Sequence, residues 1–177
     1  DPTEPSEPDP NEPDTSWYDP EKGTAEEPYV ISTKGDLLGL AEKAKETDFA
    51  GKTIKLTADI DLTGTSWEPI GKHEVTSSNK PGQVFAGTFD GNDHKITGLS
   101  MTLVNGNKIY GLFGQLSGTV KNLTLKDVTI SGTSSGKVGS VAGVLYGGTL
   151  ENVHVIATID VSANFVGGLV GSVEGSN

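Results

Sequence analysis

From Phe85 onward the apolar residues alternate with polar ones, in short β-branched runs that glycine, asparagine and serine interrupt. A period of two predicts β-strands that turn one face toward a core. Thr53–Leu56 and residues 60–62 alternate in the same way and predict two short strands upstream. After Ala50, no segment has helical periodicity long enough to compete. We therefore predict an all-β fold, with one exception.

The exception is an amphipathic helix, predicted over residues 34–47. Between Leu37 and Ala44 the apolar residues recur at the i, i+3, i+4 and i+7 spacing of one helical face. Thr33 stands at the N-cap position, and Asp36 three positions later completes a capping box. A single short helix hides an apolar face only by lying on another element, so we expect it to cap the β-structure.

The second half of the chain repeats itself. Gly-Leu-Phe-Gly at positions 111–114 recurs as Ser-Val-Ala-Gly at 140–143 and again as Gly-Leu-Val-Gly at 168–171. The segment 118–125 recurs at 148–155, with nearly the same spacing. Repeats of this period indicate stacked units.

A copy with a shorter spacing aligns the segment 96–101 with the segment 120–125, so that Ile96 matches Val120. This alignment puts Gly98, Asn122 and Asn152 at one repeat position, and glycine and asparagine tolerate the left-handed backbone conformation best. We predict a corner of the coil there. An asparagine ligand site is the less favoured alternative.

Stacking would place Leu112 on Val141 on Leu169, and Leu123 on Val153, so that each coil buries its inward row against the next. We therefore predict a right-handed single-stranded parallel β-helix, short and capped at its N-terminal end by the helix.

We expect the repeats to occupy residues 83–177, with an incomplete last coil. An uncovered β-helix end invites pairing with another strand. The expectation is that the native chain continues past Asn177, or that another molecule or a second copy covers this end.

The start of the chain differs in composition. Residues 1–28 are rich in proline and acidic residues and hold much of the net charge of -11, which arises from 24 acidic and 13 basic residues. Such a segment cannot bury enough apolar surface to fold, which predicts a disordered tether. Residues 29–82 then form the N-terminal capping segment.

Composition also excludes several classes. All 13 basic residues are lysine, so the arginine-containing basic stripe typical of nucleic-acid binding is missing. There is no cysteine, which excludes disulfides and thiolate chemistry. No apolar run approaches the roughly 20 residues that span a bilayer, so we expect no direct membrane insertion. The chain opens at Asp1 without a signal peptide, which suggests processing.

The order of motifs at residues 85–96, 111–114 and 168–171 resembles the bacterial GLUG-repeat proteins, and the segments 56–62 and 67–71 resemble the region that commonly precedes such repeats. The resemblance implies a β-helix on a secreted or cell-surface, adhesin-like protein, of the kind found in Bacteroides-type lipoproteins that are lipid-anchored through a removed N-terminal segment.

Some members of that family carry an IgA-cleaving metalloprotease domain. Here the zinc motif is missing, because Ser77 stands where the second histidine would follow His73 and Glu74.

Two groups of acids could carry chemistry. Asp59 and Asp61, on one face of a strand, could act as acid and base on a glycosidic bond, but a place in a recurring capping segment is the stronger interpretation. Asp90, Asn92 and Asp93 could ligate calcium, but this loop is also a common β-turn sequence, which we favour. We expect no catalytic residue, cofactor or metal.

The histidines lie far apart in sequence and share no repeat position: His73, His94 and His154. A histidine metal site therefore has little support.

The aromatic residues offer a better basis for binding. Trp67, Tyr110 and Tyr146 lie at turns or beside glycines, where a ring can form a platform for a sugar or peptide, although most such rings only cover the rim of a core. We predict a non-enzymatic, surface-displayed adhesin-like protein that binds a glycan or a protein. The alternatives are a β-helical polysaccharide-degrading enzyme and a structural stalk without ligand.

Overall fold

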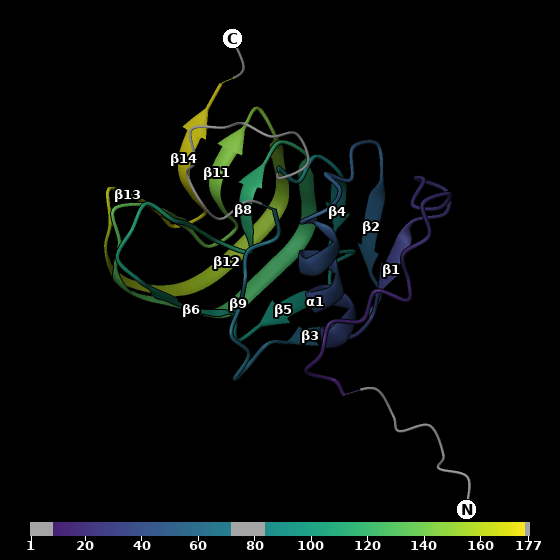
Figure 1. Cartoon of the computed structure of the whole chain (residues 1–177), viewed down its shortest axis with the longest axis horizontal. Helices are drawn as coiled ribbons and strands as arrows, with labels where there is room; N and C mark the ends of the chain where they lie inside the picture. The colour runs from purple at the N-terminus through teal and green to yellow at the C-terminus, as the bar shows by residue number, and fades with distance from the viewer. Residues whose placement is uncertain (1–8, 72–83, 176–177) are drawn as a thin grey trace, which may run out of the picture.

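The computed structural model describes residues 9–71 and 84–175, which form a right-handed parallel β-helix of about five coils (Figure 1). The first coil contributes β1 (Tyr29–Ile31), and the second contributes β2 (Thr53–Leu56) and β3 (Ile60–Asp61). The third coil contains five short strands: β4 (Thr88–Asp90), β5 (Lys95–Thr97), β6 (Ser100–Leu103), β7 (Ile109–Tyr110) and β8 (Phe113–Leu116).

The last two coils have longer strands. The fourth contains β9 (Thr119–Thr133), β10 (Lys137–Gly139) and β11 (Ala142–Tyr146). The fifth contains β12 (Thr149–Ser162), β13 (Phe165–Gly167) and β14 (Val170–Glu174). The fold class expected from the alternating pattern is confirmed. The polar loop at residues 72–82 lies outside the described residues.

Strand β9 joins most of the coils. It pairs in parallel with β4, β5 and β6 of the coil before it and with β12 of the coil after it. The register places Leu123 opposite Val153, as the repeat arithmetic predicts. The second predicted ladder is also confirmed, because the amide of Val141 donates to Leu169 O at 2.9 Å and the amide of Phe113 donates to Val141 O at 2.8 Å.

The predicted alignment of Ile96 with Val120 is wrong. Ile96 pairs with Leu125 instead, so that Gly98 lies near Lys126 and not beside Asn122. The third coil makes its corner with a longer turn at positions 91–94, where the fourth has only Asn122 and Leu123. Apolar residues recur at every second position within a coil. An alignment of two coils can therefore be shifted along the chain and still match apolar positions with apolar positions.

Close contact between backbones, without side chains, shapes the bend between β10 and β11. A Cβ added at Gly139 would collide with Ala142 O and would lie 2.6 Å from Gly171 N. A Cβ at Gly171 would likewise meet the backbone of Gly143 and Val138, and a Cβ at Gly143 would collide with the side chain of Ile109. The repeated glycines therefore allow one side of the coil to fold flat against the other.

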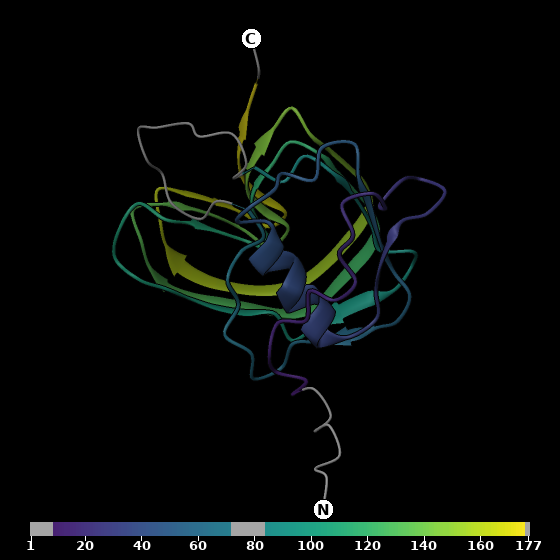
Figure 2. The same ribbon diagram turned by 45° about the vertical axis from the view of Figure 1, so that its right-hand side comes forward.

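Helix α1 (Lys34–Lys43) covers the N-terminal end of the coils, and Figure 2 shows it lying across the opening that the strands enclose. The predicted capping box is present: Thr33 Oγ1 accepts from the amide of Asp36 at 3.0 Å, and Asp36 Oδ2 accepts from the amide of Thr33 at 2.9 Å. The predicted end at position 47 is wrong, because the segment 44–47 forms tight turns.

The predicted disordered tether is wrong for residues 9–28, while residues 1–8 lie outside the described part. Trp17 packs against the hydrophobic core, with its ring centroid 5.3 Å from that of Tyr29 and 6.4 Å from that of Phe49. The hydroxyl of Tyr29 donates to Asp19 O at 2.6 Å, and the amide of Thr53 donates to Gly23 O.

Trp17 and Tyr18 supply the apolar surface that the acidic and proline residues around them lack. They begin a column of aromatic rings that continues into the β-helix: Trp17, Tyr18, Tyr29, Phe49, Phe85 and Phe113. The segment is thus a second layer of the cap.

This packing predicts that Trp17→Ala lowers the free energy of unfolding by about 2 kcal/mol, because Trp17 is half-buried against the aromatic cluster. Urea denaturation measures the change, and Glu21→Ala, in the same segment but exposed, serves as the control. Equal stability of the two variants would contradict the packing of Trp17 and favour a disordered tether.

The bend between β10 and β11 yields a second prediction. Gly139→Ala should lower the free energy of unfolding by about 2 kcal/mol, because the new methyl group meets backbone atoms that cannot move aside cheaply. Gly168→Ala is the matched control, since nothing lies within 4 Å of a Cβ at that position. Thermal denaturation of both variants tests the contrast, and similar losses would contradict it.

Candidate ligand groove

A surface groove of about 640 Å³ lies where the segment 64–69 of the second coil faces β6 and β7 of the third. Two of the three aromatic residues singled out from the sequence, Trp67 and Tyr110, line it. They are far apart in the chain and meet because stacking brings consecutive coils together. The third, Tyr146, does not line this groove.

Trp67 forms part of the floor of the groove. Its side chain is only 8% exposed, and its indole N–H is shared between Gly111 O and Leu112 O at 3.2 Å each. Ile70 close by is fully buried and bridges to Phe113. The indole therefore fixes the segment 64–69 on the turn that precedes β8, and the residue also lines the groove.

Tyr110 has a similar double role. It is 9% exposed, and its hydroxyl accepts from the amide of Val104 at 3.0 Å. This hydrogen bond holds the loop between β6 and β7 against the ring of Tyr110. Both aromatic residues thus hold the walls of the groove in place, and their polar atoms are already paired with backbone.

The rim is formed by more exposed side chains that the sequence reasoning missed. Ser66 and Thr102 offer hydroxyl groups, Val104 is 50% exposed, and Lys108 brings a positive charge. Glu68 lies in an ion pair with Lys45 at 2.9 Å. The alternation of Ser100–Leu103 could have placed Thr102 on an outward face, but nothing in the sequence placed it in one groove with Ser66.

Tyr146 lies on β11 in a separate polar cluster. Burial raises the pKa of Tyr146, and a hydrogen bond with Glu174 raises it further. Lys137 forms an ion pair with Glu174, which holds the pKa of that carboxyl below its usual range. This cluster fastens β14 to the coil before it, which gives Tyr146 a structural task apart from the groove.

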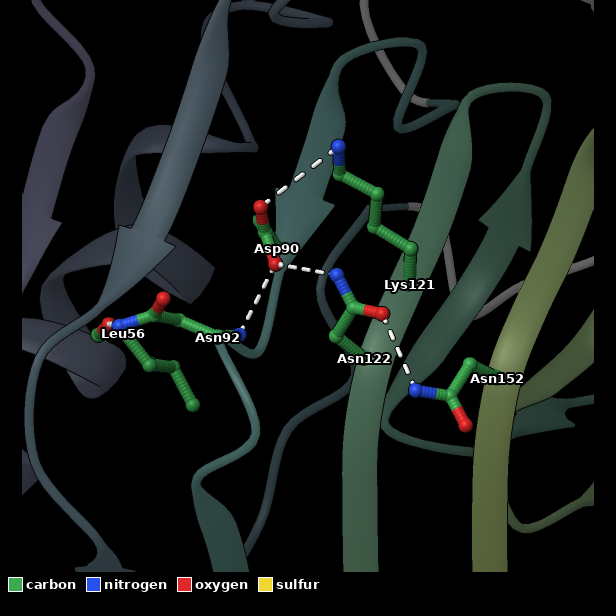
Figure 3. A network of polar contacts seen from close by, with 6 residues as sticks. All are labelled: Leu56, Asp90, Asn92, Lys121, Asn122 and Asn152. Atoms are coloured by element: carbon green, nitrogen blue, oxygen red, sulfur yellow. Dashed lines mark hydrogen bonds and ion pairs between the residues drawn. The ribbon is translucent and has the colours of Figure 1, made fainter.

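A column of asparagine residues runs across the coils at one corner (Figure 3). Asn122 and Asn152 adopt φ of 51° and 50°, as the corner prediction requires, and Asn92 beside them has a φ of 50°. The side-chain amide of Asn152 donates to Asn122 Oδ1 at 3.1 Å, and the side-chain amide of Asn122 donates to Asp90 Oδ1 at 3.2 Å. Corner geometry and the bonds between coils account for these residues without a ligand.

The calcium alternative is weakened by the partners of Asp90. Its carboxylate accepts from the backbone amide of Asn92 at 2.9 Å and lies 3.6 Å from Lys121 Nζ. The amide of His94 donates to Gly91 O at 2.8 Å, which closes a turn. The predicted β-turn is therefore present, and the carboxylate oxygens of Asp90 face protein donors (Figure 3).

Asp59 and Asp61 are exposed, and each accepts a hydrogen bond from a backbone amide, that of Lys95 for Asp59 and that of Thr63 for Asp61. The backbone amide of Lys95 and the ring of His94 hold the pKa of Asp59 below its usual range, and Thr63 does the same for the pKa of Asp61. A general acid at neutral pH needs a raised pKa. The lowered pKa values of both carboxyl groups therefore disfavour glycosidic catalysis by this pair.

The histidines do not assemble. His94 lies 3.1 Å from Asp59, and His154, which is exposed, lies 3.1 Å from Asn152 Oδ1. His73, Glu74 and Ser77 lie outside the described residues. Within residues 9–71 and 84–175, no group of three histidine, cysteine or acidic side chains is placed to hold a metal ion.

These features define a β-helix with an open surface groove, and comparisons with known proteins extend that description. Halomucin of Haloquadratum walsbyi is 35% identical over 158 residues, which cover 86% of this chain and 2% of halomucin. A protein of Evansella cellulosilytica, named as a candidate Gly-rich membrane protein, is 36% identical over 152 residues, which cover 80% of this chain and 16% of that protein. The chain thus spans a small part of these relatives. No protein-family model matches it.

Among solved structures, a candidate immunoglobulin A1 protease from Bacteroides ovatus has a TM-score of 0.56 and 20% sequence identity, covering 86% of this chain and 55% of that one. At this identity the likeness concerns the fold alone. For the part of the chain that the structure describes, no helix has the length and apolar character needed to cross a membrane.

The asparagine column predicts a graded response at Asn122. Asn122→Ala should lower the free energy of unfolding by about 2 kcal/mol. Alanine cannot make the side-chain hydrogen bond to Asp90, and it tolerates a positive φ less well than asparagine does. Asn122→Gly should lose about half as much, because glycine keeps the backbone conformation at little steric cost. Chemical denaturation distinguishes the two, and equal losses would argue against a backbone requirement.

Proposed function

We propose that this chain is a non-enzymatic cell-surface module that binds a glycan or a protein through the groove between the segment 64–69 and strands β6 and β7. The names of the two relatives, a halomucin and a Gly-rich membrane protein, support a place at the cell surface. Lipid anchoring through a preceding segment and membership of the GLUG-repeat proteins are finer parts of the same proposal.

The composition of the groove carries the proposal. A fixed aromatic floor from Trp67 and Tyr110 lies beneath a rim with hydroxyl groups and the ammonium group of Lys108. Ring edges give apolar contact to a sugar or a peptide, while hydroxyl and ammonium groups match the hydrogen-bonding groups of either ligand. A rigid floor also lowers the entropy cost of binding, because few side chains need to be ordered.

A polysaccharide-degrading enzyme is the second candidate, and the groove favours it less. Among its described lining residues the one carboxylate is Glu68, and it is ion-paired with Lys45. Glycoside hydrolysis commonly needs two carboxyl groups on opposite sides of the scissile bond. Asp59 and Asp61 lie outside the lining and have lowered pKa values.

Glycan-array binding, with a parallel assay for new reducing ends, tests the proposal. We expect binding without cleavage. New reducing ends would show that the chain is a polysaccharide-degrading enzyme. If neither binding nor cleavage is seen on glycan and protein arrays, the chain is a structural stalk without ligand.

A substitution of Lys108 tests whether the groove is the binding surface. Lys108→Ala should weaken binding by about tenfold, because a charged hydrogen-bond donor at the rim is lost. Lys126→Ala is the matched control, since Lys126 is half exposed on β9 and outside the groove. Equal weakening by the two substitutions would show that only the overall charge matters.

A further inference from the structure

The second coil takes a shorter path than the coils after it. Asp61 pairs with Thr97, and Ile70 forms a bridge with Phe113. Between these two points the second coil has eight residues and the third has fifteen. The fourth coil also has fifteen residues between the positions that pair with Thr97 and Phe113. The third coil therefore extends beyond the second at β6 and β7, and the groove lies at this step (Figure 1).

The step leaves one edge of β6 uncovered between the second and third coils. Within the described residues, β6 pairs with β9 alone and β7 with β10 alone. The amide of Thr129 on β9 donates to Leu99 O at 2.9 Å, so the main-chain groups of Leu99 and Met101 point to β9. Alternate residues of a strand point these groups to opposite sides, which directs those of Ser100 and Thr102 to the groove. No hydrogen bond joins them to the described part of the second coil.

The rim of the groove carries a positive charge that the described residues do not balance. Two of the lining residues are charged, Glu68 and Lys108. Glu68 is ion-paired with Lys45 at 2.9 Å, whereas no described carboxylate lies within ion-pair distance of Lys108. Opposite charges on a site and its partner favour association. The groove therefore favours a ligand with an acidic group.

The uncovered edge favours a peptide over a sugar. The side chains of Trp67 and Tyr110 are only 8% and 9% exposed, which leaves little ring face on which a sugar could stack. The main-chain N–H and C=O groups of Thr102 and its neighbours, by contrast, have the spacing of the donors and acceptors of an extended peptide. An unpaired strand edge is a template for such pairing.

We infer that the groove binds an extended acidic segment of a separate protein, which pairs with the free edge of β6 as an added strand. The inference rests on the proposed function and specifies the ligand of the same groove. The main chain of the segment pairs with Ser100 and Thr102, and an acidic side chain reaches Lys108. Because side chains alternate along a strand, apolar residues at every second position cover the floor at Trp67 and Met101.

The acidic start of this chain is a poor occupant of the groove. Pro2, Pro5 and Pro8 lack an amide N–H, and their spacing of three places them on both edges of an extended strand. Neither edge of this segment could therefore offer β6 a continuous row of donors. Self-association through the segment is the competing outcome, and sedimentation of the full chain detects it.

A fluorescent, acetylated peptide Ser-Val-Glu-Val-Glu-Val-Ser is the probe, and fluorescence anisotropy with the full chain measures its binding. We expect saturable binding. A peptide with lysine in place of both glutamates should bind about tenfold more weakly, because its charges repel Lys108.

Two N-methylated peptides test strand pairing itself. One carries N-methyl groups on its valines and the other on its glutamates, so that each lacks the amide donors of one edge. Only one edge of the probe can face β6, so one of these peptides should bind about tenfold more weakly and the other as the parent does. Hydrogen exchange at the Thr102 amide should also slow by about tenfold in the complex, because this amide gains an acceptor.

Lys108→Glu should weaken binding of the glutamate peptide by about tenfold and strengthen binding of the lysine peptide. Lys126→Glu is the matched control, because it makes the same change in net charge on β9, outside the groove, and should leave both affinities unchanged. Lys108→Gln provides a milder variant should Lys108→Glu fail to fold, as judged by circular dichroism.

Equal losses with both N-methylated peptides, unchanged exchange at Thr102, a dimer that excludes the peptide, or no binding of the probe to the native chain would each overturn the inference. If the probe does not bind but a glycan does, the inference falls and the proposed function stands. If neither the probe nor any array ligand binds, both fall.

Discussion

Each coil of this protein buries its inward side chains only against the coils before and after it, so parallel in-register stacking is the constraint on which the rest depends. Strand β9 shows this directly, because it is buried between two coils, while β12 with a similar sequence remains half open. Register is kept by several devices at once: apolar ladders inside, alternating charges and asparagine bonds outside, and glycines where backbones meet.

The two ends of the stack meet this constraint differently. At the N-terminal end, α1 and residues 9–28 form two layers over the first coil, with aromatic rings from Trp17 to Phe113 linking the cap to the core. At the other end, β12, β13 and β14 expose apolar side chains, Val173 at 72% among them. Within the described residues, the first coil is therefore covered and the last coil is more exposed.

Much of the fold could be predicted from the sequence, because strand alternation, the capping box at Thr33 and the repeat of 118–125 are local or periodic signals. The register of the third coil could not be predicted, since the longer turn at 91–94 leaves the alternation unchanged while shifting the pairing. The packing of residues 9–28 was hidden by composition: two aromatic residues, Trp17 and Tyr18, outweigh many prolines and acids once a matching surface exists.

The candidate groove shows a similar division. Trp67 and Tyr110 could be singled out because aromatic rings beside glycines are conspicuous, but their bonds to Leu112 O and the Val104 amide give them structural tasks. Tyr146, chosen by the same reasoning, is held by Glu174 elsewhere. Side chains that could select a ligand, such as Thr102 and Lys108, carry no local signal, since their meaning arises only from stacking.

This separation of floor and rim has a functional consequence. The floor residues are tied to backbone atoms, so a substitution there disturbs the fold before it changes recognition. Rim residues such as Ser66, Thr102 and Lys108 are more exposed and lie outside the hydrophobic core cluster, so we expect their replacement to leave the coil intact. A β-helix of this kind can therefore vary what it binds while keeping its stacking unchanged, so a shared fold carries no information about a shared ligand.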